Sequence, residues 1–330
     1  MAVVYSSAAL PKPEKQLIRR LRSLARFKGR LPRSLVTGIG DDCAVLRVQP
    51  GHEVLVTTDL NLEDVHFRRA WHPAESVGHR CLARGLSDIA AMGGEPLAAF
   101  LSLGLPAQLP QSWVDAFLRG LLGLSRRFHA PLAGGDIAQS TAGILADIMV
   151  VGSVPRGEAI LRCGARPGDV IYVTGNPGSS AAALGLLRNG KKLRPRSYPA
   201  HFFPTPRIEI GRYLRRERLA SAMIDVSDGI STDLEHICQE SEVGAVLWTG
   251  SMPSDHLEYA LHGGEDYELL FTAAKSWRVP AKIGAVPVTA IGEIIPSGKR
   301  QIWLEENGRR RRLKIRGWEH FSRKLRSGNL

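Results

Sequence analysis

The chain has 330 residues, of which 44% are hydrophobic and 23% charged, a composition typical of a globular protein with room for two domains. It contains no apolar run long enough to span a bilayer, and its start lacks the basic residues and long apolar centre of a secretory signal, so we expect a cytoplasmic protein. Lys and Arg outnumber Asp and Glu by 44 to 32, which gives a net charge of +12.

The basic residues gather in three stretches, 12–33, 188–196 and 307–326. No nucleic-acid-binding module accompanies them, and aromatic residues make up only 6% of the chain. The charge therefore favours solvated surfaces, or attraction of phosphorylated ligands, over specific nucleic-acid binding. Four widely spaced cysteines, Cys43, Cys81, Cys163 and Cys238, form no CxxC pair, so we predict reduced, mostly packed thiols.

The first half of the chain mixes helical and strand patterns. Apolar residues recur at helical spacing over 14–27. We predict a strand over 53–59 with a polar tip, a helix over 73–94 and a strand over 97–105, then a helix over 111–128, a short strand over 130–136 that breaks at two glycines, and a strand over 143–154.

The second half begins after a Pro- and Gly-rich passage at 153–168. We predict a strand, a glycine-rich turn and a helix over 169–187, an irregular segment over 189–206, helices over 208–220 and 230–241, a strand running into a loop over 222–229, strands over 267–274 and 288–295, and a hairpin over 301–315. Because helices and strands mix in both halves, α/β or α+β is favoured.

Aspartates stand where several of these elements meet loops. Asp41 and Asp42 follow a Gly-Ile-Gly turn; Asp59, Asp88, Asp136, Asp225 and Asp228 continue the series. Carboxylates suit magnesium, a hard cation that prefers oxygen ligands. Glycines beside them would let backbone N–H groups approach phosphate oxygens. Together these residues indicate a metal-dependent nucleotide site.

Taken singly, each of these signals is more typical of a polar turn, a helix cap or a solvated side chain than of a ligand site. The usual nucleotide motifs are missing: the chain has no GxxxxGK[ST] and no kinase HRD or DFG. If ATP binds, another architecture must hold it.

Eight motifs follow one another along the chain: "GIGDDCAVL", "TTDLNLEDVHF", "LSDIAAMGGEP", "GGD", "LRCGARPGDVIYVTG", "IDVSDGISTDL", "LHGGEDYELLF" and "RGWEHF", which span residues 38 to 321. In type and order they resemble the motifs of thiamine-monophosphate kinases. That family belongs to an ATP-binding superfamily shared with aminoimidazole ribonucleotide synthetase and selenophosphate synthetase. The resemblance implies ATP-dependent phosphorylation of thiamine monophosphate to thiamine diphosphate.

The resemblance also implies a fold and an assembly. We expect an N-terminal ATP- and metal-binding domain over 1–152, with a mixed sheet that pairs in a homodimer at a barrel-like interface. An α/β domain over 153–330 would complete the substrate site. We expect no membrane contact.

Residue roles follow from the same resemblance. The magnesium positions it implies are Asp42, Thr57, Thr58, Asp59, Asp88, Asp136, Asp225 and Asp228. Gly135, Asp136, Arg162 and Ser227 match ATP contacts, and His66, Glu265 and Trp318 match substrate contacts. We expect no general base, because the acceptor phosphate, with a second pKa of about 6, is already largely ionised.

Five residues depart from the usual family motifs: Asn61, Asp64, Gly85, Ile137 and His262. All the metal positions are present, so these departures bear on substrate choice. Two alternatives remain open. One is a related ATP-dependent enzyme with a different phosphorylated acceptor; the other is a non-catalytic protein that binds nucleotides or nucleic acid.

Overall fold

The computed structural model describes residues 11–25, 32–296, 301–318 and 320. It is a mixed α/β structure with sheets of mixed orientation, which confirms the predicted fold class. The chain separates into two compact units, one of residues 1–159 with 192–208, the other of residues 160–191 with 209–330. The domain roles and the barrel-like dimer interface stay predictions. Among the described residues, no helix has the length and apolar character needed to cross a membrane.

A four-stranded sheet forms the centre of unit 1. Its order is β3 (His52–Leu62), β6 (Leu145–Pro155), β4 (Glu95–Pro106), β5 (Leu132–Ser140). β6 pairs antiparallel with both β3 and β4, whereas β4 and β5 are parallel. A parallel pair needs a crossover connection, and α3 supplies it.

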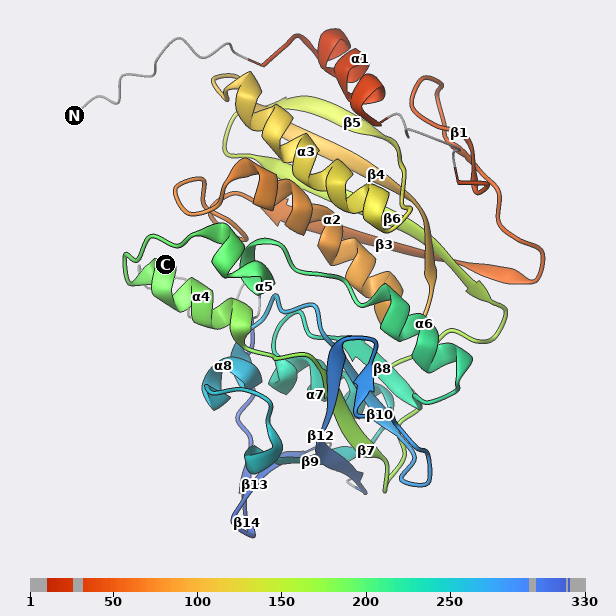
Figure 1. Ribbon diagram of the computed structural model, residues 1–330, viewed down its shortest axis with the longest axis vertical. Helices are drawn as coiled ribbons and strands as arrows, with labels where there is room; N and C mark the ends of the chain where they lie inside the picture. The colour runs from red at the N-terminus through yellow and green to blue at the C-terminus, as the bar shows by residue number, and fades with distance from the viewer. Residues whose placement is uncertain (1–10, 26–31, 297–300, 319, 321–330) are drawn as a thin grey trace. The chain divides into compact units, whose positions relative to one another are not determined.

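Two helices, α2 (Ala74–Ala91) and α3 (Gln111–Arg127), cover one face of this sheet (Figure 1). They cross closely because each has a glycine at the contact. A Cβ on Gly78 would overlap the Phe117 carbonyl, and one on Gly120 would overlap the Glu75 carbonyl. Gly85 in turn lets α2 approach the sheet, since a Cβ there would lie 2.6 Å from the Val150 side chain.

Helix α1 (Glu14–Ala25) joins this layer through its apolar face and one ion pair. Leu17 and Leu21 are buried, and Arg20 donates from two nitrogens to the two carboxylate oxygens of Asp115 on α3, both at 2.6 Å. Burial raises the pKa of Asp115, but the hydrogen bonds from Arg20 and Gln111 outweigh it and bring the pKa below its usual value. Residues 26–27 of the predicted helix lie outside the described residues.

The smaller elements of unit 1 are β1 (Leu35–Thr37) and β2 (Val45–Leu46), which flank the Gly-Ile-Gly loop, and η1 (Pro195–Ser197) and α5 (Pro199–Phe202). The last two lie in the 192–208 stretch. This stretch is held by two histidine contacts: His201 Nε2 lies 3.0 Å from His72 Nε2 in a buried pair, and the half-buried His79 ring bonds the Pro204 carbonyl at 2.7 Å.

Unit 2 is built on an eight-stranded sheet. Its order is β14 (Arg309–Arg312), β13 (Ile302–Glu306), β9 (Gly244–Trp248), β12 (Val286–Ile295), β7 (Val170–Thr174), β10 (Leu269–Ala273) and β8 (Ala222–Asp225), with β11 (Lys282–Ile283) pairing with β12. The other elements are α4 (Ser179–Arg188), α6 (Ile208–Arg216), α7 (Ile230–Glu240), η2 (Thr249–Ser251) and α8 (Leu257–His262). A continuous apolar core joins α7 and α8 to β7, β8, β9 and β10.

Several element predictions are confirmed and several are wrong. The helices α2, α3, α4 and α7 and the 301–315 hairpin lie where predicted. The first strand does not end at Asp59 but runs on to Leu62, and the 130–136 strand continues through its glycines to Ser140. The segment predicted as irregular contains η1 and α5. Strand β9 and helix α8 were not predicted. Cys43 and Cys163 are exposed, so only two of the four thiols are packed.

Candidate functional site

Strand β3 and helix α2 bring three of the predicted oxygen ligands into one group in unit 1. Side chains alternate along β3, so Thr57 and Asp59 face α2 with the buried Leu55 and Asn61. Thr57 Oγ1 donates a hydrogen bond to Asp88 Oδ2 on α2. The structure therefore places Thr57, Asp59 and Asp88 together, beneath the helix rather than at a strand tip.

Thr58 occupies a different environment. It lies on the opposite face of β3, between the exposed Val56 and Leu60. Its side chain is thus separated by the sheet from those of Thr57 and Asp59. The sequence prediction grouped all three because it ended the strand at this point.

The Asp59 carboxylate carries an electrostatic cost. Burial is the largest influence and raises its pKa; Asp147 on β6 adds to this, and Arg84 on α2 opposes it. Arg84 Nη2 lies 3.3 Å from Asp59 Oδ1. A bound cation would lower this cost, because an opposite charge favours the ionised carboxylate.

The Gly-Ile-Gly loop and the GGD strand also lie near one another in unit 1. A Cβ on Gly38 would be 3.7 Å from the Ala133 carbonyl, which immediately precedes the two glycines of β5. Asp42 and Asp136 are both exposed. Asp136 Oδ1 accepts the N–H of its neighbour Ile137 at 2.8 Å, and Asp41 Oδ1 accepts that of Asp42 at 2.9 Å.

Gly135 has a structural reason to be glycine. Its φ is +143°, a conformation that side chains rarely adopt, and a Cβ would overlap the Leu101 carbonyl on β4. The close pairing of β5 with β4 therefore accounts for this glycine whether or not phosphate binds there.

The loop after β3 carries His66 and the departure Asp64. Asp64 has φ of +64°, so it holds the left-handed conformation that a glycine adopts without strain. His66 Nδ1 accepts the Leu62 N–H at 3.0 Å, and this fixes the ring. His66 is half-buried beside the buried Phe67.

In unit 2, strand β8 ends at Asp225 and the Ser227-Asp228-Gly229 loop leads into α7. The shape of this loop is set by Asp233, which the sequence analysis did not single out. Its Oδ2 accepts the N–H groups of residues 227, 228 and 229 at 3.1, 3.2 and 3.0 Å. Burial raises the Asp233 pKa well above its usual value, and the charges of Asp225 and Asp228 raise it further. This excess of negative charge is the setting in which a cation binds favourably.

Two predicted substrate residues lie against this same loop. The Glu265 N–H donates to the Ser227 carbonyl at 2.8 Å, and the Trp318 N–H donates to the Asp228 carbonyl at 3.2 Å. Unit 2 therefore brings Asp225, Ser227, Asp228, Glu265 and Trp318 into one cluster. Arg162 is exposed, in a segment that runs beside β8.

The glycine-rich turn before α4 already has an anionic partner. Asp266 Oδ2 accepts the Gly178 N–H at 2.6 Å, and Oδ1 accepts the Ser180 N–H at 3.0 Å. Burial raises the pKa of Asp266 to about 7 even though these two bonds oppose the shift. Because a carboxylate of the protein caps this turn, its N–H groups are not a phosphate cradle.

The donor set fits a hard cation. Its members are carboxylates and hydroxyls, the ligands that magnesium prefers, and they lie in both units. Within the part of the chain that the structure describes, no three His, Cys, Asp or Glu side chains stand close enough to form one coordination shell. Magnesium commonly takes only one or two carboxylates together with water and phosphate oxygens. The assignment of all eight magnesium positions stays a prediction.

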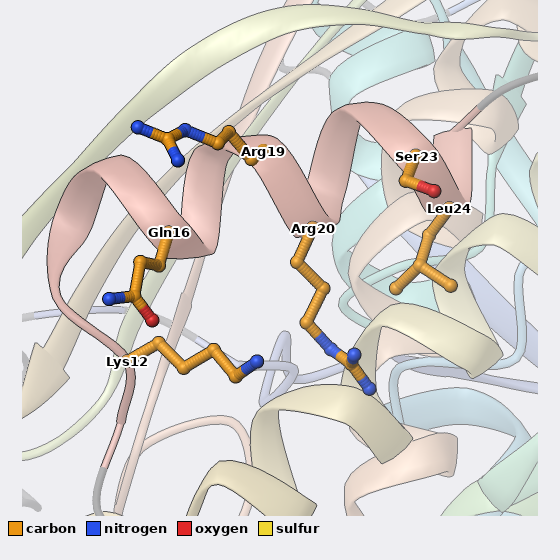
Figure 2. Close-up of a pocket in the computed structure, with 6 residues that line it drawn as sticks. All are labelled: Lys12, Gln16, Arg19, Arg20, Ser23 and Leu24. Carbon is orange, nitrogen blue, oxygen red and sulfur yellow. The ribbon is translucent and has the colours of Figure 1, made fainter.

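A separate surface pocket of about 430 Å³ lies on α1 (Figure 2). It is lined by Lys12, Gln16, Arg19, Arg20, Ser23 and Leu24. Lys12, Gln16 and Arg20 extend to one side of the helix, and Arg19 extends to the other. Arg20 is already engaged by Asp115, and none of the predicted site residues lines this pocket.

The family comparisons identify the chain. It matches the family model of AIR synthase related protein, N-terminal domain, over residues 40–154, and the C-terminal domain model over residues 166–305. These two models define the class, a two-domain AIR synthase related protein. The thiamine-monophosphate kinase of Bacillus subtilis (strain 168) is 33% identical over 307 residues, covering 87% of this chain and 94% of the relative. The Salmonella typhimurium (strain LT2) kinase is 38% identical over 294 residues, covering 82% and 89%. The chain belongs to the thiamine-monophosphate kinase family of enzymes, as its motifs predicted.

Solved structures agree with this assignment. A thiamine-monophosphate kinase from Stenotrophomonas maltophilia K279a matches with a TM-score of 0.77 and 33% identity, covering 89% of this chain and 96% of that one. The structure described as "AaThiL complexed with AMPPCP and TMP" matches at 0.74 and 31% identity, covering 83% and 89%. The hydrogenase maturation protein HypE in complex with ATP, at 17% identity and 0.71, shares the fold.

Proposed function

We propose that this chain transfers a phosphoryl group from ATP to thiamine monophosphate and so forms thiamine diphosphate. The proposal rests on family membership and on one observation. In unit 2 the loop of Ser227 and Asp228, assigned to ATP and metal, bonds directly to the backbone of Glu265 and Trp318, assigned to the acceptor. Transfer between two bound phosphates requires the residues that bind the donor to lie next to those that bind the acceptor, so that the reacting groups are held close together.

The residues of both units divide this task. Asp42, Thr57, Thr58, Asp59, Asp88, Asp136, Asp225 and Asp228 are the proposed ligands for several magnesium ions. Because its side chain lies on the opposite face of β3, Thr58 would serve a different ion from Thr57 and Asp59. When bound, such ions neutralise the phosphates and favour in-line transfer. Gly135, Asp136, Arg162 and Ser227 are the proposed ATP contacts, and Arg162 offers a fixed, forked cation for phosphate oxygens.

The acceptor side needs recognition rather than proton removal. A monoester phosphate is largely ionised near neutral pH, so its oxygen can attack without a general base. Trp318 offers a flat face to the cationic thiamine ring. Glu265 offers a carboxylate to its aminopyrimidine, and His66 is the third proposed contact.

We propose a homodimer formed through the face of the unit 1 sheet that α2 and α3 leave uncovered. Val54, Val56 and Leu60 on β3 and Leu145 and Met149 on β6 are exposed there, with Val56 the most exposed at 62%. A group of apolar side chains on one sheet face is typical of an interaction surface. A second copy of the same sheet would supply a matching apolar face.

The test is product formation from defined acceptors. Purified protein is incubated with ATP, Mg²⁺ and thiamine monophosphate, and the products are separated and quantified. We expect thiamine diphosphate and ADP in equal amounts, and no transfer to thiamine, which lacks the acceptor phosphate. ATP turnover only with another phosphorylated acceptor would replace this proposal with a related enzyme of the superfamily. ATP binding without turnover on any acceptor would indicate a non-catalytic protein.

A further inference from the structure

A polar network in unit 2 joins the C-terminal segment to α8 and α7. Arg316 Nη2 donates to Glu258 Oε2 at 2.8 Å and lies 3.4 Å from His262 Nε2. Glu258 and His262 both belong to α8. His262 Nδ1 lies 2.9 Å from Ser231 Oγ on α7. The imidazole therefore stands between the arginine and α7.

The hydrogen-bond roles in this network follow from the chemistry of arginine. A guanidinium only donates, so His262 Nε2 is the acceptor and the neutral ring carries its proton on Nδ1. Nδ1–H then donates to Ser231 Oγ. His262 is only 10% exposed, so α7 and α8 hold this orientation. A serine at 262 would be too short to reach both partners.

The network ends directly beside Trp318. Residue 317 between them is glycine, and a Cβ there would overlap both Thr232 Oγ1 and the Asp228 carbonyl. The next residue, Trp318, donates its N–H to that same carbonyl at 3.2 Å. The chain is thus fixed on one side of Gly317 by Arg316 and on the other by Asp228.

We propose that Arg316, Glu258 and His262 are positioning residues that set the place of Trp318 for the acceptor. The inference rests on the proposed function, in which Trp318 contacts thiamine monophosphate. Arg316 acts through the tryptophan and not by touching the acceptor itself. The side chains of Arg316 and Glu258 are 47% and 62% exposed, and exposed ion pairs hold their partners weakly. The expected effects are accordingly modest.

A double-mutant cycle tests the proposal. Arg316→Ala should raise the KM for thiamine monophosphate about three- to tenfold and leave the KM for ATP within about twofold. Arg316→Lys, which keeps a cation for Glu258, should restore part of the loss. In a Trp318→Ala background the Arg316→Ala change should have no further effect, because residues that act through one another are not additive. Additive effects, or an unchanged acceptor KM, would overturn the proposal.

Arg310→Ala is the matched control. Arg310 makes an exposed ion pair with Glu305 at 2.7 Å in the same unit, on the β13–β14 hairpin and outside this network. Its removal should leave both KM values unchanged. If Arg310→Ala raised the KM for thiamine monophosphate as much as Arg316→Ala does, the effect would come from the loss of any exposed ion pair, and the proposal would be overturned.

Hydrogen–deuterium exchange of the ligand-free protein separates this inference from the proposed function. Arg316→Ala and His262→Ser should both speed exchange in a peptide that contains Trp318, and Arg310→Ala should not. Unchanged exchange in both network variants would overturn the positioning role even if thiamine diphosphate forms. Faster exchange in a protein that fails to make thiamine diphosphate would leave the network in place and overturn the proposed function alone.

Discussion

Acidic residues that are neighbours in this sequence occupy very different environments. Glu265 lies at the proposed acceptor site, whereas the next residue, Asp266, is buried and caps α4. Asp228 lies in the loop that we propose binds phosphate. The Asp233 carboxylate, five residues further along the chain, accepts hydrogen bonds from the N–H groups of that loop. In both cases one carboxylate is proposed to meet a ligand and the other holds the backbone that presents it.

Asp59 is a proposed metal ligand whose ionised form is disfavoured by burial, a cost that a bound cation would lower. We predict that Asp59→Asn lowers the rate of transfer by about 10²–10³-fold, the usual scale for losing a group that stabilises transition-state charge. Its melting temperature should stay the same or rise, because a neutral amide avoids the cost of the buried carboxylate. Steady-state kinetics and thermal unfolding measure the two effects.

Asp147→Asn is the control for this prediction. Asp147 is a close enough neighbour to raise the pKa of Asp59, but it is not a proposed ligand. We expect its activity to stay within a few-fold of wild type. Near wild-type transfer in Asp59→Asn, or equal losses in the two variants, would remove the specific role of Asp59.

Sequence patterns predicted these acidic positions but not their surroundings. Most of the aspartates could be read from the chain because they lie beside a glycine or at the end of an apolar run; Asp88, inside a helix, was recognised from the family motif. The separation of Thr58 from Thr57 and Asp59 was missed because the polar residues suggested the end of a strand, although the alternation continues to Leu62. Asp233 and Asp266 were missed because a buried cap depends on contacts that no local pattern contains.

At the scale of elements, the crossing of α2 and α3 depends on glycine. We predict that Gly120→Ala destabilises the protein by about 1–3 kcal/mol, because the new methyl group would overlap the Glu75 carbonyl and push the helices apart. Gly123→Ala in the same helix is the control. Its Cβ meets nothing within 4 Å, so it should stabilise by up to about 1 kcal/mol through helix propensity. Equal unfolding free energies for the two variants would contradict the close crossing.

The cap on α4 makes stability depend on pH. The Asp266 carboxyl has a pKa of about 7 in the folded chain, against an ordinary value of 3.8, so the folded state holds its proton more tightly. Its contribution to stability is therefore full below about pH 4 and is lost as the pH rises to about 7. The free energy of unfolding of the wild type should fall by about 2 kcal/mol relative to that of Asp266→Asn between pH 5 and pH 7, because asparagine does not titrate. Denaturant unfolding at several pH values measures it, and a difference that is constant with pH would contradict the assigned pKa.

Local patterns predicted most helices because apolar spacing and glycine stops are local signals. Strand β9 and helix α8 were missed for a different reason. β9 is an interior strand of five residues that are almost all buried, so it shows no alternation of apolar and polar residues. α8 has only six residues, too few to show the apolar spacing of a helix. Their positions are set by packing in the core of unit 2.

For the whole molecule, the apolar face of β3 and β6 predicts self-association. We expect Val56→Glu to convert the proposed homodimer into a monomer, because it places a charge in the centre of the interface. Val45→Glu is the control, since Val45 is 49% exposed on β2 and outside this face. Sedimentation velocity distinguishes the two forms. A wild-type monomer, or a dimer that survives Val56→Glu, would contradict the proposed interface.

Motif order along the chain predicted the family, which the comparisons confirm, and with it the mixed α/β fold. The order of strands in the two sheets was beyond reach, because pairing joins residues far apart in sequence, as β8 does with β10. The sequence also did not predict that residues 192–208 belong to unit 1. A contact between His201 and His72, which are far apart in the sequence, holds this stretch there, and no local pattern indicates such a contact.

The account as a whole depends on aspartates that serve phosphoryl transfer through bound magnesium. Its most direct test is the rate of thiamine diphosphate formation as a function of free Mg²⁺ at a fixed, saturating concentration of ATP and thiamine monophosphate. We predict no product in the presence of a chelator, and a rate that still rises with Mg²⁺ after all ATP is already the magnesium complex. A rate that is independent of Mg²⁺ beyond that point would contradict the need for several ions, and product formed with the chelator present would contradict the metal site itself.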